Sequence, residues 1–354
     1  MVPLVSALSL WWLAFIALGV MPNFAQAGEP QPGAPVVSQA SEDAPKLSLP
    51  LQCELGKTCF IQSYVDIDLG PGVQDFACGS STYEGHSGTD FRLLSVADAQ
   101  KKVAVLASAE GIVKGVRDGM PDILLRNSGG PDSVKNRECG NGVVIDHGRG
   151  WETQYCHMLK GSVITKTGDT VTRGQRLGDT GFSGDADFAH VHFEVRHNGQ
   201  VIDPFSAQSQ NAACLKDKPP VSGLWQDEAA KALHYTNGEA INAGFAADVP
   251  SLTSLEEQSA PAAPNSTSKA LVFFASFINL RAGDQVKIEV TGPEGFMAGE
   301  TSKPLERNKA TWLSYGGKKL TKSAWPKGSY AGTALVLRDG KSIAGISRTL
   351  DLPQ

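Results

Sequence analysis

The chain has 354 residues, of which 41% are hydrophobic and 19% are charged. This length predicts two or three domains, and the hydrophobic share is ample for packed cores. The formal net charge of -5 argues against a nucleic-acid-binding protein, because such proteins usually carry a basic surplus. The 38 glycines and 20 prolines indicate turn-rich β structure joined by linkers.

The first 27 residues contain no Asp, Glu, Lys or Arg and end in Ala25-Gln26-Ala27. An apolar stretch that ends in small residues at this spacing is typical of a secretory signal peptide, here cut after Ala27. An uncleaved membrane anchor is the alternative, since no basic residue precedes the apolar stretch. We expect cleavage, no stable membrane span in the mature protein, and a periplasmic or secreted location.

Four further segments follow the signal peptide. Residues 28–48 are rich in Pro, Ala and Ser without periodicity and predict a flexible linker. Residues 49–215 carry short apolar runs separated by glycines and predict a mostly antiparallel β domain. Residues 216–269 predict one short helix, "WQDEAAKALHY", followed by a second linker. Residues 270–354 resume strand-like alternation and predict a small β-sandwich, which has neither histidine nor cysteine and therefore suits a binding or spacer role.

Two local signals refine the domain at 49–215. Ser95 is followed three residues later by Asp98, which predicts a helix start. The sequence "DHGRGW" between two strand-like runs predicts a hairpin turn.

The cysteines are even in number and fit three disulfides in an exported protein. Cys53 and Cys59 would close a small loop, and Cys139 and Cys156 lie near each other across the predicted hairpin. A third pair would then join the remaining two, although the sequence leaves the connectivity open. No CxxC pair is present, so a cysteine zinc site is not expected. The six are Cys53, Cys59, Cys78, Cys139, Cys156 and Cys214.

The segment "FAHVHFEV", residues 188–195, places two histidines one residue apart in a strand-like run. Because the side-chain period of a strand is two, His190 and His192 point to one face, and Phe193 and Val195 to the other. Burying two adjacent imidazoles is costly unless something binds them, and metal is the commonest partner. A half-exposed strand with two satisfied histidines explains this segment equally well.

The segment "YEGHSGTDF" supplies further metal-ligand types. Asp90 follows His86 by four residues, and glycines on either side of the histidine allow the backbone to turn so that both side chains converge. Together with one histidine of the strand pair they give three ligands and leave one tetrahedral position open, which is the hydrolytic pattern. His157, in "QYCHM", and the other strand histidine are then available to orient water and stabilise an oxyanion. Taken alone, "HSGTD" would be read as an ordinary turn with an exposed histidine.

From about Gly85 to Phe205 the sequence resembles the lysostaphin-like zinc endopeptidases that cut peptidoglycan peptides. The resemblance rests on "GHSGTDF" (family form H-x-x-x-D), "YCHM" (Y-x-H) and "HVHFEV" (H-x-H), in that order. The glycine-rich "GDTVTRGQRLGDTGFSG" precedes the last motif, as in the family. Met158 stands where leucine is usual, and residues 118–140 form a longer insertion. No HExxH motif is present, which excludes the helical zinc-protease arrangement.

The resemblance implies that His86, Asp90 and His192 bind one zinc ion per chain, and that His157 and His190 are catalytic histidines outside the ligand set. It implies a peptidoglycan peptide as substrate. The fold class expected is mainly β, with an antiparallel β-sheet metallopeptidase domain followed by a small immunoglobulin- or fibronectin-like β-sandwich.

Two other functions compete with an exported zinc endopeptidase. One is a catalytically silent relative that binds cell wall or activates another hydrolase, but such relatives usually lose ligands and all five positions are filled here. The other is a carrier or adaptor, because "EGIVKG" and "GDTVTRGQ" resemble lipoyl-type β-sandwiches. A lysine in the required tight hairpin is missing, and the histidines have no purpose there.

Overall fold

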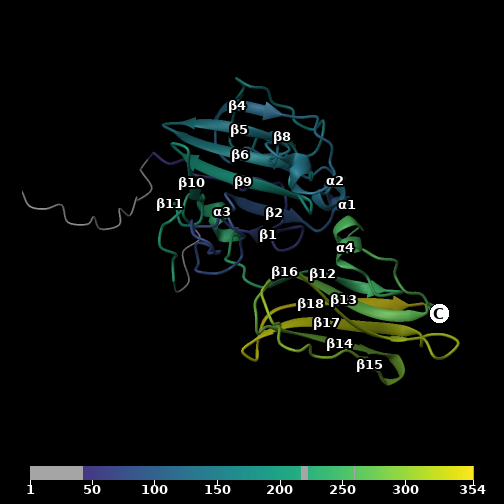
Figure 1. Ribbon diagram of the computed structural model, residues 1–354. Helices are drawn as coiled ribbons and strands as arrows, with labels where there is room; N and C mark the ends of the chain where they lie inside the picture. The colour runs from purple at the N-terminus through teal and green to yellow at the C-terminus, as the bar shows by residue number, and fades with distance from the viewer. Residues whose placement is uncertain (1–42, 217–221, 259, 354) are drawn as a thin grey trace, which may run out of the picture. The chain divides into compact units, whose positions relative to one another are not determined.

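The computed structural model describes residues 43–216, 222–258 and 260–353 (Figure 1). The predicted signal peptide and most of the first predicted linker lie outside these residues. Within them, no helix combines the length and the apolar character needed to cross a membrane.

The first β region is built around a nine-stranded sheet in which every pair of neighbouring strands is antiparallel. The strand order is β1-β2-β9-β6-β5-β4-β7, with β10 joining β9 and β11 joining β10. Strands β3 and β8 form a separate pair. Their bounds are β1 Cys59–Ser63, β2 Thr89–Leu93, β3 Ala104–Leu106, β4 Gly111–Arg117, β5 Asn141–Gly148, β6 Trp151–Met158, β7 Thr170–Val171, β8 Arg176–Asp179, β9 His190–His197, β10 Gln200–Asp203 and β11 Gln208–Ser209.

The alternation predicted for β9 is present in the structure. Val191, Phe193 and Val195 are buried in the main hydrophobic core of this region. The intervening histidines therefore face the other side of the sheet. The predicted turn joins β5 to β6, and the predicted helix start is α1 (Val96–Ala99), where the Ser95 hydroxyl accepts the backbone N–H of Asp98.

All six cysteines are paired. The disulfides join Cys53 to Cys59, Cys78 to Cys214, and Cys139 to Cys156. This is the cysteine pairing outlined from the sequence. The bridge between Cys53 and Cys59 closes a short loop in the N-terminal segment, and the bridge between Cys139 and Cys156 connects the end of the insertion at 118–140 to β6.

A second β region consists of two antiparallel sheets, ordered β12-β13-β16 and β15-β14-β17-β18. Side chains from both sheets share one buried core, for example Phe273 of β13, Val286 of β14 and Val336 of β17. The fold is thus mainly β and antiparallel throughout, as predicted, while the immunoglobulin- or fibronectin-like kind of this region stays a prediction. The bounds are β12 Glu239–Ala246, β13 Ala270–Leu280, β14 Gln285–Gly292, β15 Phe296–Ala298, β16 Lys309–Lys319, β17 Gly328–Arg338 and β18 Lys341–Leu352.

Helices are short in the part of the chain that the structure describes. The predicted helix at "WQDEAAKALHY" is present as α3. Besides α1, the helices are α2 Leu125–Ser128, α3 Asp227–Ala232 and α4 Leu252–Gln258, with 3-10 turns at Pro131–Val134 and Pro293–Gly295.

The structure differs from the sequence prediction between the two β regions. Strand β12 lies within residues 216–269, where we expected only a helix and a linker, and it pairs with β13. Its sequence "EAINAGFA" is dominated by small residues, so its apolar alternation is weak. Helix α4 lies within the second predicted linker and begins where the side chains of Ser251 and Ser254 accept each other's backbone N–H groups. In the first predicted linker, Leu47 is fully buried and forms a bridge with Trp225.

One buried carboxyl group makes the stability of the fold depend on pH. Asp203, at the end of β10, is fully buried. One carboxylate oxygen accepts hydrogen bonds from Phe205 and Ser206, and the other has no partner among the described residues. Burial raises the pKa of Asp203 to about 7, the hydrogen bonds from Ser206 and Phe205 offset part of this rise, and the charge of Asp75 adds to it.

Because the folded-state pKa is raised, stability from the protonated Asp203 is present below the ordinary pKa and is lost as the pH rises towards about 7. We expect wild type to lose about 2 kcal/mol of unfolding free energy relative to Asp203→Asn between pH 5 and pH 8. Urea denaturation of both proteins at the two pH values measures this difference, in which all other titrating groups cancel. An equal difference between the two proteins at both pH values would contradict the assignment.

Candidate metal centre

Three side chains with metal-ligating atoms converge where β2 and β9 pair. Asp90 lies in β2, and its register partner across the ladder is His192 in β9. His86 precedes β2 and reaches Asp90 after a turn in which Gly85 adopts a φ of 73°, a conformation that favours glycine. Strand pairing therefore places two of the side chains opposite each other, and the turn adds the third.

Close packing around the centre also requires glycine at position 88. A Cβ atom on Gly88 would lie 2.7 Å from the His192 ring and 2.7 Å from the carbonyl oxygen of Phe193. A larger residue would have to displace His192, and with it one corner of the centre.

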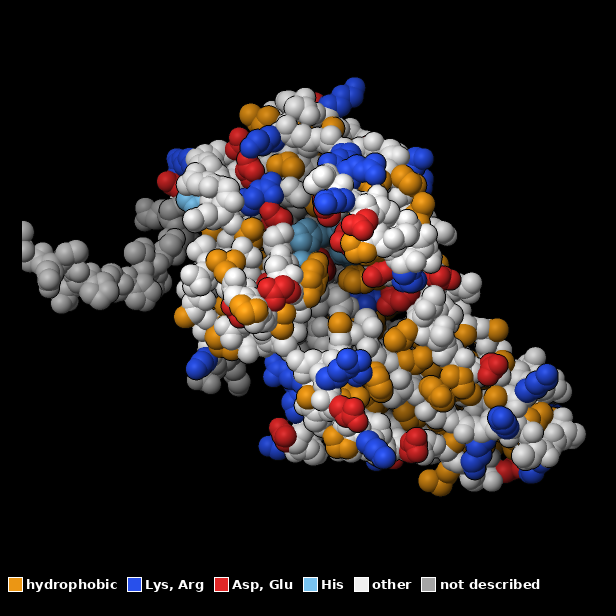
Figure 2. Space-filling view, viewed as in Figure 1, with side chains coloured by type: hydrophobic (Ala, Val, Ile, Leu, Met, Phe, Trp, Pro, Cys, Tyr) orange, Lys and Arg blue, Asp and Glu red, His pale blue; other side chains and the backbone are white. Residues whose placement is uncertain are grey.

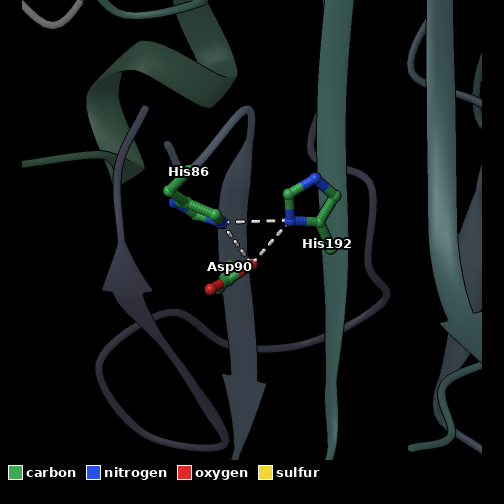
Figure 3. Close-up of side chains that lie close together, drawn as sticks. All are labelled: His86, Asp90 and His192. Carbon is green, nitrogen blue, oxygen red and sulfur yellow. Dashed lines mark hydrogen bonds and ion pairs between the residues drawn. The ribbon is translucent and has the colours of Figure 1, made fainter. Parts of the chain in front are cut away.

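The three candidate ligand atoms form a triangle (Figure 3). Nε2 of His86 and Nδ1 of His192 each lie 3.0 Å from Oδ1 of Asp90, and the two nitrogens lie 3.0 Å from each other. His86 and Asp90 are each only 2% exposed, so water does not separate these groups.

The outer nitrogen of each imidazole is held by its own partners. Nδ1 of His86 donates to the carbonyl oxygen of Tyr64 at 2.7 Å, which leaves the lone pair of Nε2 facing Asp90. Nε2 of His192 faces the carboxylate of Glu194 at 3.6 Å and the hydroxyl of Ser87 at 3.5 Å. Nδ1 of His192 is thereby turned towards Asp90.

The charge balance of the centre favours a cation. Burial opposes ionisation of Asp90, but the charges of His86 and His190 and hydrogen bonds from the surrounding histidines hold its pKa well below its usual range. Burial likewise lowers the pKa of His192, but hydrogen bonds to Asp90 and Glu194 outweigh it and raise the pKa to about 9. Positive charge is therefore stabilised beside Asp90.

These residues fit a zinc ion. Two imidazole nitrogens and one carboxylate oxygen are a donor set that zinc accepts, with bonds of about 2.0–2.2 Å. A tetrahedral zinc ion separates its ligand atoms by about 3.3 Å, close to the 3.0 Å edges of the triangle. Without a proton or a cation between them, the lone pairs of the three atoms would repel one another.

The two remaining motif histidines lie beside the triangle. His157 is in β6 and adopts a φ of 61°, a strained conformation of the kind that clusters at functional sites. Its Nδ1 donates to the carbonyl oxygen of Ser183 at 2.7 Å, and Nδ1 of His190 donates to the carbonyl oxygen of Phe188 at 2.9 Å. The rings of His157 and His190 are 4.5 Å apart, and both Nε2 atoms are left without a proton in the neutral state.

Both of these histidines are uncharged near neutral pH. Burial lowers the pKa of His157 well below its usual range, and the neighbouring His190 and His192 lower it further. Burial also lowers the pKa of His190, although the charge of Asp90 offsets part of this effect. Each Nε2 can therefore accept a proton from a group held beside the centre.

The other histidines are not part of this arrangement. His147 bonds to the carbonyl oxygen of Glu110 and to Thr153, and His197 stacks on Trp151 at 4.3 Å. His234 is exposed. The structure thus brings together all five residues predicted from the motifs, while these three histidines lie apart from the centre.

Residues 84–204 match the model of peptidase family M23. This segment of the chain is therefore similar to the M23 peptidases. The resemblance stated from the motifs is confirmed by this match, which covers the segment containing all five predicted site residues.

Curated relatives match part of the chain at low identity. The chain is 29% identical over 133 residues to the peptidoglycan DD-endopeptidase ShyA of Vibrio cholerae, covering 38% of this chain and 25% of that protein. It is 30% identical over 127 residues to the DD-carboxypeptidase/endopeptidase Mpg of Neisseria meningitidis, covering 35% and 23%. The chain therefore spans about a quarter of the length of these relatives.

Solved structures of peptidase catalytic domains and M23 proteins also match. The catalytic domain of EnpA from Enterococcus faecalis is 23% identical, with a TM-score of 0.28, covering 46% of this chain and 94% of that one. The catalytic domain of lysostaphin from Staphylococcus simulans is 23% identical, with a TM-score of 0.25, covering 40% and 85%.

A cavity of about 320 Å³ opens beside the M23 centre, and its lining includes His86, His157 and His192. Figure 2 shows histidine side chains at the bottom of a hollow, with acidic side chains near its rim. The disulfide between Cys139 and Cys156 lines the same cavity, and the carbonyl oxygen of Cys139 accepts the backbone N–H of His157. The insertion at 118–140 therefore forms part of the wall of the M23 site.

Sequence reasoning missed two residues of the M23 site. Tyr83 lines the cavity, and its ring lies 4.3 Å from the ring of His86. Glu194 lines it as well and accepts a hydrogen bond from Ser87 at 2.6 Å. Alternation along β9 could have found Glu194, because it follows His192 by two residues on the same face. Nothing in the sequence around Tyr83 distinguished it from an ordinary turn residue.

Proposed function

We propose that this protein is an exported zinc-dependent endopeptidase that hydrolyses peptide cross-links of bacterial peptidoglycan. The observation that carries the proposal is the triangle of His86, Asp90 and His192 beside two buried histidines, in a cavity open to a substrate. The M23 match and relatives named as peptidoglycan endopeptidases support the reaction and the substrate class. The three disulfides support an oxidising compartment outside the cytoplasm.

In this proposal His86, Asp90 and His192 hold the zinc ion, with one ion per chain. When bound, zinc supplies Lewis-acid polarisation of the scissile carbonyl and makes a hydrolytic water more acidic. Nε2 of His157 and Nε2 of His190, the latter 3.6 Å from Oδ1 of Asp90, carry no proton in this tautomer and can take one from the attacking water and return it to the leaving amine. The carbonyl oxygens of Ser183 and Phe188 fix the tautomer that makes this transfer feasible.

Digestion of purified sacculi tests the proposal. The purified chain with about one zinc per chain should release peptide fragments, and mass analysis should place new termini at a cross-link. Chelation should stop the release and added zinc should restore it, because the ligands hold a removable ion. A chain that binds zinc but releases nothing would instead support a silent, wall-binding relative. A chain that stays metal-free at neutral pH in excess zinc would overturn the metal site.

A further inference from the structure

A fully buried guanidinium lies one strand away from the catalytic histidines. Arg92 is in β2, two residues after Asp90, and its register partner in β9 is His190. A buried charge is costly unless it is paired and hydrogen-bonded. The position of this arginine therefore depends on the groups that neutralise it.

Those groups come from two distant parts of the chain. Both guanidinium-facing oxygens of Glu256 accept hydrogen bonds from Arg92 at 2.8 Å, and the side-chain oxygen of Gln62 accepts another at 2.6 Å. Both bonds to Glu256 come from Nη2 of Arg92, while Nη1 donates to Gln62 and Nε donates to the carbonyl oxygen of Leu93 at 3.2 Å. Hydrogen bonds from three nitrogens fix the plane of the guanidinium. Arg92 is consequently held in one orientation.

That orientation places the guanidinium against Phe188. The central carbon of the Arg92 guanidinium lies 4.8 Å from the centre of the Phe188 ring. The ring of Phe188 packs on the imidazole of His190 at 4.4 Å and 31°, and the carbonyl oxygen of Phe188 accepts Nδ1–H of His190. Phe188 thus contacts both Arg92 and His190, and contacts His190 through its ring and its backbone.

Glu256 lies outside the M23 match of residues 84–204. It belongs to α4, which lies beside α1 (Figure 1). The neighbouring Leu255 is buried with Ala246 of β12 and Phe274 of β13. The residue that neutralises Arg92 is therefore fixed by the second β region.

We propose that Arg92 is a positioning residue: held by Glu256 and Gln62, it fixes Phe188 and, through Phe188, the imidazole of His190. The proposal rests on the proposed function, in which His190 takes part in turnover. It assigns to α4 a role in the proposed reaction, since loss of the Glu256 carboxylate leaves the buried positive charge of Arg92 uncompensated and removes the bonds from Nη2 that help to hold it against Phe188.

Glu256→Gln tests this role in the full-length chain. Glutamine keeps the shape and one acceptor oxygen but removes the charge. We expect kcat on a soluble cross-linked peptide to fall on the order of 10-fold, because small displacements of catalytic groups have effects of this size. KM and zinc content should stay at wild-type values. Glu257→Gln is the matched control, because its carboxylate is 45% exposed and lies 3.8 Å from its nearest arginine.

The same substitution made in the His190→Ala protein distinguishes a positioning role of Arg92 from general destabilisation of the fold. In His190→Ala, addition of Glu256→Gln should leave the residual turnover unchanged, because the group that it positions is already gone. Phe188→Leu, which keeps an apolar side chain without the ring, should show the same pattern and serves if Glu256→Gln folds poorly. A reduction by the same factor with and without His190 would overturn the positioning role.

Failure of the proposed function and failure of the positioning role give different experimental results. Zinc-loaded wild type without any turnover would remove the proposed function and the premise of the inference with it. Active wild type in which Glu256→Gln matches Glu257→Gln, or in which its effect does not depend on His190, would overturn the role of Arg92 alone.

Discussion

Asp90→Ala and His192→Ala are each expected to lose bound zinc and turnover together. Each substitution removes one of the three atoms of the ligand triangle, and the two that remain cannot enclose the ion. Asp90→Ala also removes the negative charge that lies 3.0 Å from both imidazoles, so the lone pairs of two nitrogens are left facing each other. Zinc content by elemental analysis should fall from about one ion per chain to near zero, and sacculus digestion should fall to background.

The control for these substitutions is His234→Ala, which removes an exposed histidine from outside the centre. It should retain wild-type zinc and activity. Zinc binding by the unmodified chain should weaken as the pH falls from about 9, the pKa of His192 without the ion, and further through the ordinary histidine range, because protons compete for the imidazole nitrogens. Retention of stoichiometric zinc by His192→Ala would show that another residue completes the ligand set.

His157→Ala and His190→Ala are expected to give the opposite combination, with zinc retained and turnover lost. Neither side chain belongs to the ligand triangle, and each has an unprotonated Nε2 atom for proton transfer, although Nε2 of His190 also lies 3.6 Å from Oδ1 of Asp90. We expect turnover to fall on the order of 10²-fold or more, as for other lost acid–base or oxyanion groups. Zinc content read beside activity for each variant measures the separation.

The strand pair His190 and His192 provides the sharpest comparison within this set. The side chains lie on one face of β9, where His190 is buried and His192 is partly exposed, and they have different hydrogen-bond partners. If His190→Ala lost its zinc while His192→Ala kept it, the two roles would be exchanged. Loss of zinc from both would indicate that a third imidazole ligates the ion, which would close the open position needed for hydrolysis.

Part of the metal centre could be predicted from the sequence, because short-range backbone geometry determines which of its side chains point the same way. A period of two places His190 and His192 on one face, and the spacing between His86 and Asp90 spans a single glycine turn. The antiparallel ladder then brings Asp90 opposite His192, which the sequence could not specify by spacing alone. The family resemblance, which rests on the order of three motifs, supplied the ligand set but not the strand pairing.

The parts that escaped prediction depend on contacts between distant residues. Arg92 and Glu256 are separated by 164 positions, and neither has a local pattern that distinguishes it from an exposed charge. Strand β12 is composed of small residues, so its identity as a strand depends on pairing with β13 and not on its own periodicity. Leu47 lies in a Pro/Ala/Ser-rich segment without apolar periodicity, and only its burial and its bridge to Trp225 show that it belongs to the core.

The disulfide between Cys78 and Cys214 determines what happens when a protease cuts the chain between these two cysteines. It closes a covalent ring across a sequence separation of 136, and His86, Asp90, His157, His190 and His192 all lie within that ring. A single proteolytic cut in the insertion at 118–140 would divide the chain into two pieces. One piece carries His86 and Asp90, and the other carries His157, His190 and His192. The bridge keeps the two pieces tethered, so their effective concentration for each other stays high. Nicking at that site therefore cleaves the chain without letting either half of the centre diffuse away.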